Sequence, residues 1–276
     1  MGAANVVPGV SGGTIALISG IYSRIIDALN AVLSWDTWKE LFHGRFKDFW
    51  KKIDGWFLLA LAIGVVLSVF TLAKLLEYCL AAHPVATWAF FFGLILASAF
   101  FMLKAVKGWK WVDVLLVVAG VALGLLVCTL SPSQTPDNLL FIFICGAIAI
   151  CTMILPGVSG SFILVVMGKY DYMMSAVSNL DWGVLAVFAL GCLVGILAFA
   201  KLLHWLLARW ERQTMLVLTG FVLGSLVKVW PWANTKDVLP DQIGHLPDIG
   251  PAIIWCLLGI AFIVAIELLG RKKKEK

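Results

Sequence analysis

Charged residues are scarce in this sequence, and long stretches lack them altogether. Asp, Glu, Lys and Arg make up 13% of its 276 residues, whereas 62% are hydrophobic. Soluble globular proteins carry about 25% charged residues. The charge-free stretches cover most of the chain: 56–73, 84–103, 114–136, 138–168, 182–200, 213–227 and 249–266. Because a bilayer-spanning helix needs about 20 mostly apolar residues, the sequence excludes a soluble protein and predicts an all-α polytopic membrane protein.

The spacings that mark disulfides and metal sites are also missing. The six cysteines lie inside apolar stretches without a CxxC spacing, which is typical of small buried hydrophobic residues. The four histidines all lie away from the repeated motif described next. We therefore expect no metal, no cofactor and no nucleic-acid partner.

A five-residue motif occurs twice. Pro-Gly-Val-Ser-Gly at 8–12 returns at 156–160, and eight of the fifteen positions of 8–22 are identical in 156–170. Further matches follow in the same order along both halves: Ala73–Leu76 with Ala200–Leu203, Gly93 with Gly220, and Gly120–Ala122 with Gly259–Ala261. Matches in conserved order indicate a duplication.

The duplication divides the chain into 1–131, 139–270 and a basic tail, 271–276. Each half contains a helical hairpin, with its tip at 8–12 or 156–160, followed by three membrane spans. The expected spans are 56–80, 85–103, 112–130, 183–207, 214–230 and 251–269.

An amphipathic segment interrupts the first half. Between 35 and 53, Trp, Phe, Leu and Ile recur at helical spacing opposite Lys and Arg. This pattern predicts a helix that lies on the cytoplasmic membrane surface; a soluble loop is the alternative.

Positive charge orients the spans, because cytoplasmic loops are enriched in Lys and Arg. With 35–53 inside, 15 basic residues fall on the cytoplasmic side and three outside. This arrangement requires that 139–179 start and finish outside, as a re-entrant hairpin. Three crossings per half then make the two repeats inverted, a common transporter plan. It places the C-terminus in the cytoplasm.

The motif itself favours an anion site. Proline breaks a helix and glycine permits positive φ, so helix N–H groups are left open at each tip. Inverted symmetry brings the tips towards each other near the midplane. The alternative is that both turns are structural kinks. The candidate phosphate ligands are the small and hydroxyl residues at the tips: Gly9, Ser11, Gly12, Gly13, Thr14, Gly157, Ser159, Gly160 and Ser161.

Charged residues near the hairpins are candidates for supporting roles. Lys74 and Lys201 occupy equivalent repeat positions near helix ends. Two interpretations are open: each charge has a function inside the membrane, or each long side chain carries its charge to the membrane surface. Arg24 and Lys169 follow the hairpins, as partners of an anionic headgroup or as solvated interfacial charges. Asp27 is the one carboxylate on a hairpin arm before its end and is a candidate for proton coupling.

These motifs resemble the bacterial polyprenyl-phosphate transporter family, formerly a family of unknown function. The resemblance rests on 1–14 with 20–22, on 155–162 with 168–170, and on 91–98. It implies that the chain returns undecaprenyl phosphate from the outer to the inner leaflet of the cytoplasmic membrane, for reuse in cell-envelope polymer synthesis. It also implies dependence on the proton gradient.

Two other functions stay open on the residues alone. A transporter or channel for a small soluble anion fits the tips equally well. A membrane lipid-pyrophosphate phosphatase also uses such turns, but phosphoryl transfer needs charge neutralisation and a general base. Here Gly12 and Gly160 follow the serines where those enzymes place arginine, and no Asp or Glu adjoins either tip. We therefore expect that the chain is not an enzyme.

Overall fold

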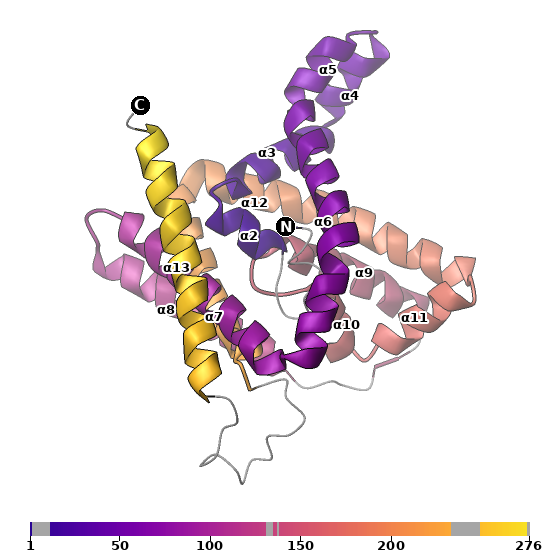
Figure 1. Ribbon diagram of the computed structural model, residues 1–276. Helices are drawn as coiled ribbons and strands as arrows, with labels where there is room; N and C mark the ends of the chain where they lie inside the picture. Colours follow the sequence, from indigo (N-terminus) through magenta and orange to yellow (C-terminus); the bar gives the residue numbers. More distant parts are fainter. Residues whose placement is uncertain (2–11, 131–134, 137, 233–248, 275–276) are drawn as a thin grey trace. The chain divides into compact units, whose positions relative to one another are not determined.

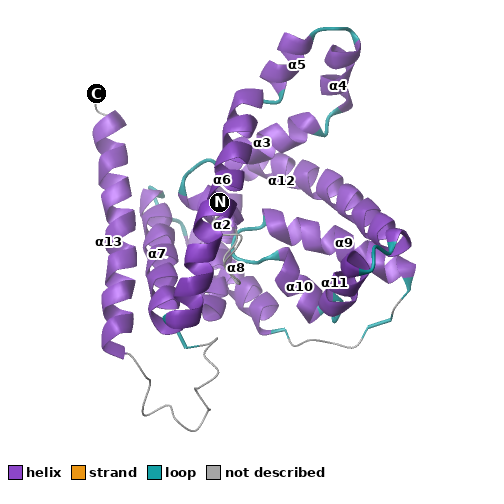
Figure 2. Ribbon diagram, turned by 45° about the vertical axis from the view of Figure 1, so that its right-hand side comes forward, coloured by secondary structure: helices purple, strands orange, loops and turns teal. Residues whose placement is uncertain are grey.

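The computed structural model describes residues 1, 12–130, 135–136, 138–232 and 249–274. Every regular element in these ranges is a helix (Figures 1 and 2). The first half contains α2 (Gly12–Ile18), α3 (Tyr22–Val32), α4 (Trp35–Phe42), α5 (Phe46–Lys52), α6 (Gly55–Ala82), α7 (Pro84–Ala105) and α8 (Trp111–Thr129). The second contains α9 (Leu139–Ile154), α10 (Gly160–Val166), α11 (Tyr170–Ser178), α12 (Trp182–Ser225), the 3₁₀ turn η1 (Leu226–Val229) and α13 (Ile249–Lys274).

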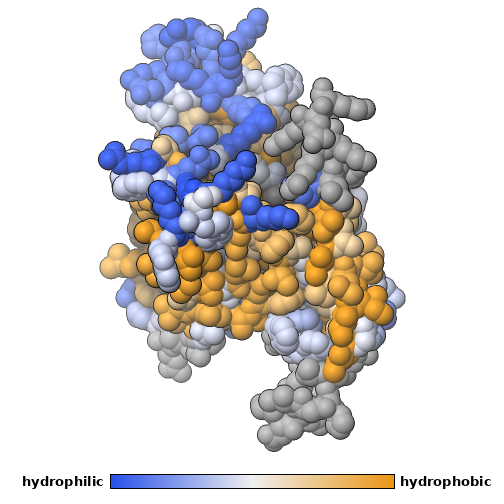
Figure 3. Space-filling view, turned by 90° about the vertical axis from the view of Figure 1, so that its left-hand side faces the viewer, coloured by the Kyte–Doolittle hydropathy of each residue, from blue (hydrophilic) through white to orange (hydrophobic). Residues whose placement is uncertain are grey.

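Three of the described stretches are long and apolar enough to cross a membrane: α7, α8 and 182–229. Shorter apolar runs lie in α6, α9 and α13. Hydrophobic residues cover much of the surface seen in Figure 3. Because lipid can solvate such a surface and water cannot, the chain is a membrane protein.

Two compact units make up the chain. The first comprises Met1–Phe70 and Leu130–Met215, and the second comprises Thr71–Thr129 and Leu216–Lys276. Each unit therefore combines segments from both halves of the sequence, so the units do not coincide with 1–131 and 139–270.

Glycines allow close helix packing in the second unit. A Cβ on Gly93 of α7 would collide with the carbonyl of Cys256 in α13, and one on Gly259 of α13 would collide with the carbonyl of Phe90 in α7. Helices in membranes pack most closely where residues are small. The α7–α13 contact therefore depends on both glycines.

The same arrangement occurs between α8 and the last part of α12. A Cβ on Gly120 would meet the carbonyl of Val217, and one on Gly220 would meet the carbonyl of Val117. This pair of helices is therefore also held close by reciprocal glycines.

The expected spans 183–207 and 214–230 correspond to two helices that meet at a kink. The range of α12, 182–225, contains both, and Trp210 between them has non-helical backbone angles of φ −137° and ψ 50°. The expected loop between the two spans is thus reduced to one non-helical residue.

The expected helix over 35–53 is instead two short helices. They are α4 and α5, which lie side by side in Figures 1 and 2. The chain reverses at Gly44, whose φ of +74° is readily adopted by glycine. The location of the α4–α5 pair on a membrane surface remains a prediction.

Candidate functional site

The second motif forms a sharp turn between two packed helices. α9 ends at Ile154, Gly157 takes φ +96°, and α10 begins at Gly160. α9 and α10 lie side by side (Figures 1 and 2). A methyl group on Gly160 would lie 2.8 Å from the carbonyl oxygen of Ala149. The small residues that break the helix therefore also let its two arms approach each other.

Serine hydroxyls occupy the start of α10. The Ser159 Oγ accepts a hydrogen bond of 3.2 Å from the backbone N–H of Phe162, which is an N-cap. The same Oγ lies 3.1 Å from the Oγ of Ser161, whose side chain is exposed. The turn thus presents two adjacent hydroxyl groups, one of which also stabilises the helix end.

The first motif lies mostly outside the described residues, which exclude Gly9 and Ser11. Gly12, Gly13 and Thr14 are described; they form the first residues of α2, and all three are buried. The backbone N–H of Gly157 donates a hydrogen bond of 2.7 Å to the Oγ1 of Thr14. The structure therefore brings residues next to the first motif into direct contact with the second motif.

Two further contacts fix this meeting point. A methyl group on Gly13 would lie 2.8 Å from the carbonyl oxygen of Ile154. The Tyr22 hydroxyl donates a hydrogen bond of 3.2 Å to the same oxygen. The start of α2 and the start of α3 therefore both contact the end of α9, and all of these residues belong to the first unit.

The candidate charge partner Arg24 is engaged by another group. Its Nη2 donates to the Oδ1 of Asp54 at 3.0 Å, and its guanidinium lies 4.2 Å from the centre of the Phe57 ring. The Arg24 hydrogen bond holds the pKa of the Asp54 carboxyl below its usual value. Arg24 thus links α3 to the start of α6.

Lys169 is buried, with 3% of its surface exposed, so the burial contradicts one of its two alternatives, the solvated interfacial charge. Its Nζ donates to the carbonyl oxygen of Thr135 at 2.8 Å and lies 5.8 Å from the ring centres of Phe141 and Tyr172. A carbonyl oxygen and aromatic faces compensate part of the cost of burying an ammonium group. Lys201 is exposed on α12, and the side chain of Lys74 lies outside the described part.

Asp27 has a partner that the sequence does not reveal. Its Oδ1 lies 2.9 Å from the Nδ1 of His204 in α12. The two residues are 177 positions apart, so no local pattern links them. Within the described ranges, no group of three His, Cys, Asp or Glu side chains is placed to hold a metal ion.

Comparison with known proteins adds an independent result. Residues 1–246 match the family model described as VCA0040-like: undecaprenyl phosphate translocase-like. The chain is 42% identical over 248 residues to a polyprenyl-phosphate transporter of Vibrio cholerae, covering 89% of this chain and 79% of that protein. It is 33% identical over 259 residues to a polyprenyl-phosphate transporter of Staphylococcus aureus, covering 87% and 86%. No solved structure matches it significantly.

Proposed function

Because this chain belongs to the undecaprenyl phosphate translocase-like family, we propose that it moves undecaprenyl phosphate across the bacterial cytoplasmic membrane. The direction is from the outer to the inner leaflet, where the lipid carrier is reused for cell-envelope polymers. Both relatives are named transporters, and the proposed process needs no covalent step.

The observation that carries the proposed phosphate site is the hydrogen bond between Gly157 and Thr14. It brings residues from both halves of the sequence together at the turn that precedes Ser159 and Ser161. Hydroxyl and backbone N–H groups are suitable donors to phosphate oxygens. We assign the headgroup to the surface formed by Ser159, Ser161 and the adjacent residues of both motifs.

The members of this site have different roles. Thr14 is 1% exposed and already accepts the Gly157 N–H, so it holds the two motifs together. Ser161 is exposed and able to donate outward. Gly13 and Gly160 allow close approach to the backbone of α9. We assign Gly9 and Gly12 to the same set as small residues and Ser11 as a further hydroxyl donor.

Reciprocal glycine contacts support two repeats. The sequence matches pair Gly93 with Gly220 and Gly120 with Gly259. The α7–α13 contact through Gly93 and Gly259 therefore corresponds to the α12–α8 contact through Gly220 and Gly120. Equivalent residues making equivalent contacts are what an internal twofold relationship requires. We propose that the repeats are inverted, with α9 and α10 as a re-entrant hairpin.

Coupling is assigned to Asp27 and His204. Their 2.9 Å contact joins α3, which follows the first motif, to α12. Histidine side chains act as proton carriers in proteins, so a proton exchanged at this pair can alter the link. We propose that the proton gradient acts through this pair. Arg24, Lys74, Lys169 and Lys201 are proposed instead as charge partners of the anionic headgroup.

The transport assay uses liposomes that contain undecaprenyl phosphate in the outer leaflet only. Purified protein should accelerate its appearance in the inner leaflet relative to protein-free liposomes. A second polyprenyl phosphate added to the liposomes should slow the movement of undecaprenyl phosphate by competition. Inorganic phosphate at the same concentration should not slow it. No acceleration would contradict the proposed function, and equal competition by inorganic phosphate would favour a small-anion transporter.

The proposed orientation has its own test. In a variant without native cysteines, Asp171→Cys should react with an impermeant reagent from outside the cell. Lys273→Cys, in the basic tail, should react only after the membrane is opened. Labelling of both from the same side would contradict the re-entrant hairpin.

A further inference from the structure

A groove lies where the α4–α5 pair joins α6, in the first unit. Its volume is about 660 Å³, and it is open to the surface. The lining consists of aromatic, basic and small residues: Phe46, Lys47, Trp50, Lys51, Asp54, Gly55 and Trp56. None of these residues belongs to the proposed phosphate site or to the proposed coupling pair.

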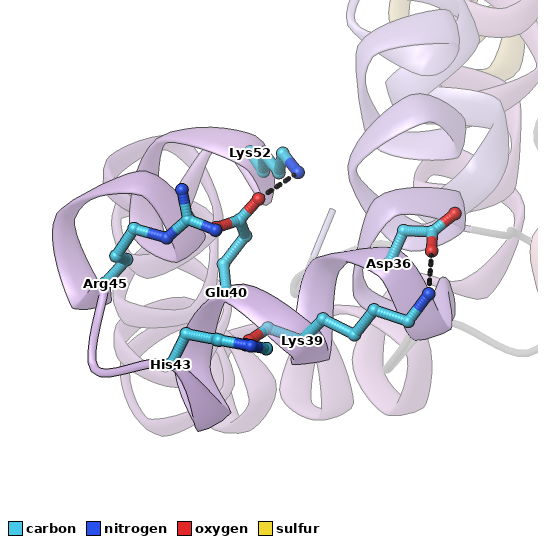
Figure 4. A network of polar contacts seen from close by, with 6 residues as sticks. All are labelled: Asp36, Lys39, Glu40, His43, Arg45 and Lys52. Carbon is cyan, nitrogen blue, oxygen red and sulfur yellow. Dashed lines mark hydrogen bonds and ion pairs between the residues drawn. The ribbon is translucent and has the colours of Figure 1, made fainter.

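Most basic side chains of this helical pair are neutralised by carboxylates. Glu40 accepts from Lys52 at 2.9 Å and pairs with Arg45 at 2.8 Å (Figure 4). Lys39 pairs with Asp36 at 2.8 Å, also shown in Figure 4. The Glu40 contacts hold α4 against the turn and against the end of α5, whereas the Lys39–Asp36 pair lies within α4.

The acidic residue in the groove is neutralised as well. Asp54 pairs with Arg24 through two hydrogen bonds. Its negative charge therefore does little to attract a cation into the groove or to repel an anion from it.

Two lysines differ from the rest. Lys47 and Lys51 are exposed, and neither makes an ion pair with any carboxylate in the described part of the chain. They are four residues apart on α5, so they lie on the same helix face, and both line the groove. Lys47 and Lys51 thus bring two positive charges without a described ion pair to the groove. The Asp48 carboxylate, which also has no described ion pair, does not line it.

Aromatic rings accompany the two lysines. Phe46 stacks on Trp50 at 5.8 Å, and Trp50 meets the edge of Trp56 at 5.8 Å. Phe46 and Trp56 are 58% and 74% exposed. Among the described residues, nothing accepts a hydrogen bond from the Trp50 Nε1. Exposed Trp beside Lys is typical of the headgroup level of a membrane.

We propose that this groove binds the headgroup of an anionic phospholipid of the surrounding bilayer. Lys47 and Lys51 contact the phosphate, and the rings of Phe46, Trp50 and Trp56 contact the glycerol and upper acyl chains. Both charge and apolar surface are then satisfied by one ligand, whereas a free phosphate would leave the rings in water. The bound lipid anchors the α4–α5 pair to the bilayer, whatever lipid the protein transports.

The test is native mass spectrometry of the purified full-length protein with equimolar phosphatidylglycerol and phosphatidylcholine. The wild type should retain phosphatidylglycerol in preference. At roughly fivefold per lysine, Lys47→Gln/Lys51→Gln should bind phosphatidylglycerol about 25-fold more weakly, with phosphatidylcholine binding unchanged. Lys104→Gln/Lys107→Gln removes two exposed charges elsewhere and should keep the wild-type preference.

Three results would overturn the proposal. One is an unchanged preference in the Lys47/Lys51 variant. Another is an equal loss in the Lys104/Lys107 variant, which would indicate a general effect of net charge. The third is displacement of phosphatidylglycerol by a modest excess of inorganic phosphate, which would make the groove a site for a free anion.

Discussion

The backbone N–H of Gly157 donates a hydrogen bond of 2.7 Å to the hydroxyl oxygen of Thr14, across 143 positions of sequence. Gly157 belongs to the second copy of the repeated motif, and Thr14 follows the first copy by two residues. The donor is a glycine at φ +96°, in a turn that directs its N–H towards α2. This contact joins the second motif to the residues that directly follow the first, whereas the sequence shows the two motifs only as separate repeats.

The reciprocal glycines predict a specific loss of stability. In Gly120→Ala, the added methyl group collides with the carbonyl of Val217. Overpacking of this kind costs about 1–3 kcal/mol. The melting temperature of the detergent-purified variant should therefore fall clearly below that of the wild type.

Gly64→Ala is the matched control. Gly64 also lies inside a helix, α6, but has no heavy atom within 4 Å of an added Cβ. Alanine is favoured over glycine in a helix by up to about 1 kcal/mol, so this variant should melt at or above the wild-type temperature. Equal destabilisation of both variants would show that the α8–α12 contact is not as close as described.

The α4–α5 pair should loosen in acid. Lys52 holds the pKa of Glu40 below its ordinary value of 4.5, chiefly through their hydrogen bond. A carboxyl with a depressed pKa stabilises the folded form fully above its unfolded pKa, and this contribution disappears as the pH falls through the folded pKa. The loss should therefore occur below pH 4.5.

Glu40→Gln imitates this protonation at neutral pH. Amide hydrogen exchange across 39–52 should become faster in this variant. Asp48→Asn, which removes a carboxylate without a described ion pair, should leave exchange unchanged. Slow exchange in both variants would mean that aromatic packing alone holds the pair.

The Asp27–His204 contact predicts that transport depends on this pair for its coupling to protons. Asp27→Asn removes the carboxylate of the pair, and His204→Gln removes the imidazole. If the pair couples transport to protons, each variant should reduce the acceleration of transport by a proton gradient imposed across the liposome membrane. Lys201→Gln, on the same helix as His204, should keep the wild-type acceleration. Wild-type acceleration in all three variants would show that coupling occurs elsewhere.

Much of the helical arrangement could be predicted from the sequence, because apolar runs end at charges, prolines or glycines. The run 85–103 corresponds to α7, and 112–130 corresponds to α8. The turn at 156–160 also occurs where proline and glycine predict it, with Ser159 as the N-cap. These features depend on local chemistry, which a single sequence records.

Features that depend on distant contacts could not be predicted. The burial of Lys169 requires the Thr135 carbonyl, which is 34 positions away. The partner of Asp27 is His204 in α12, a histidine that lies outside every motif. The break between α4 and α5 is a different case, because it depends on one local residue. The sequence contains Gly44, but the surrounding amphipathic pattern does not imply that its φ is positive.

The most direct test of the shared site is the transport rate of Thr14→Val compared with Thr14→Ser. Valine keeps the volume but removes the oxygen that accepts the Gly157 N–H, whereas serine keeps it. Leaving a buried donor unpaired costs about 1–3 kcal/mol, so Thr14→Val should move undecaprenyl phosphate roughly tenfold more slowly in liposomes. Thr14→Ser should approach the wild-type rate. A wild-type rate in Thr14→Val, with normal insertion, would contradict a phosphate site built from both motifs.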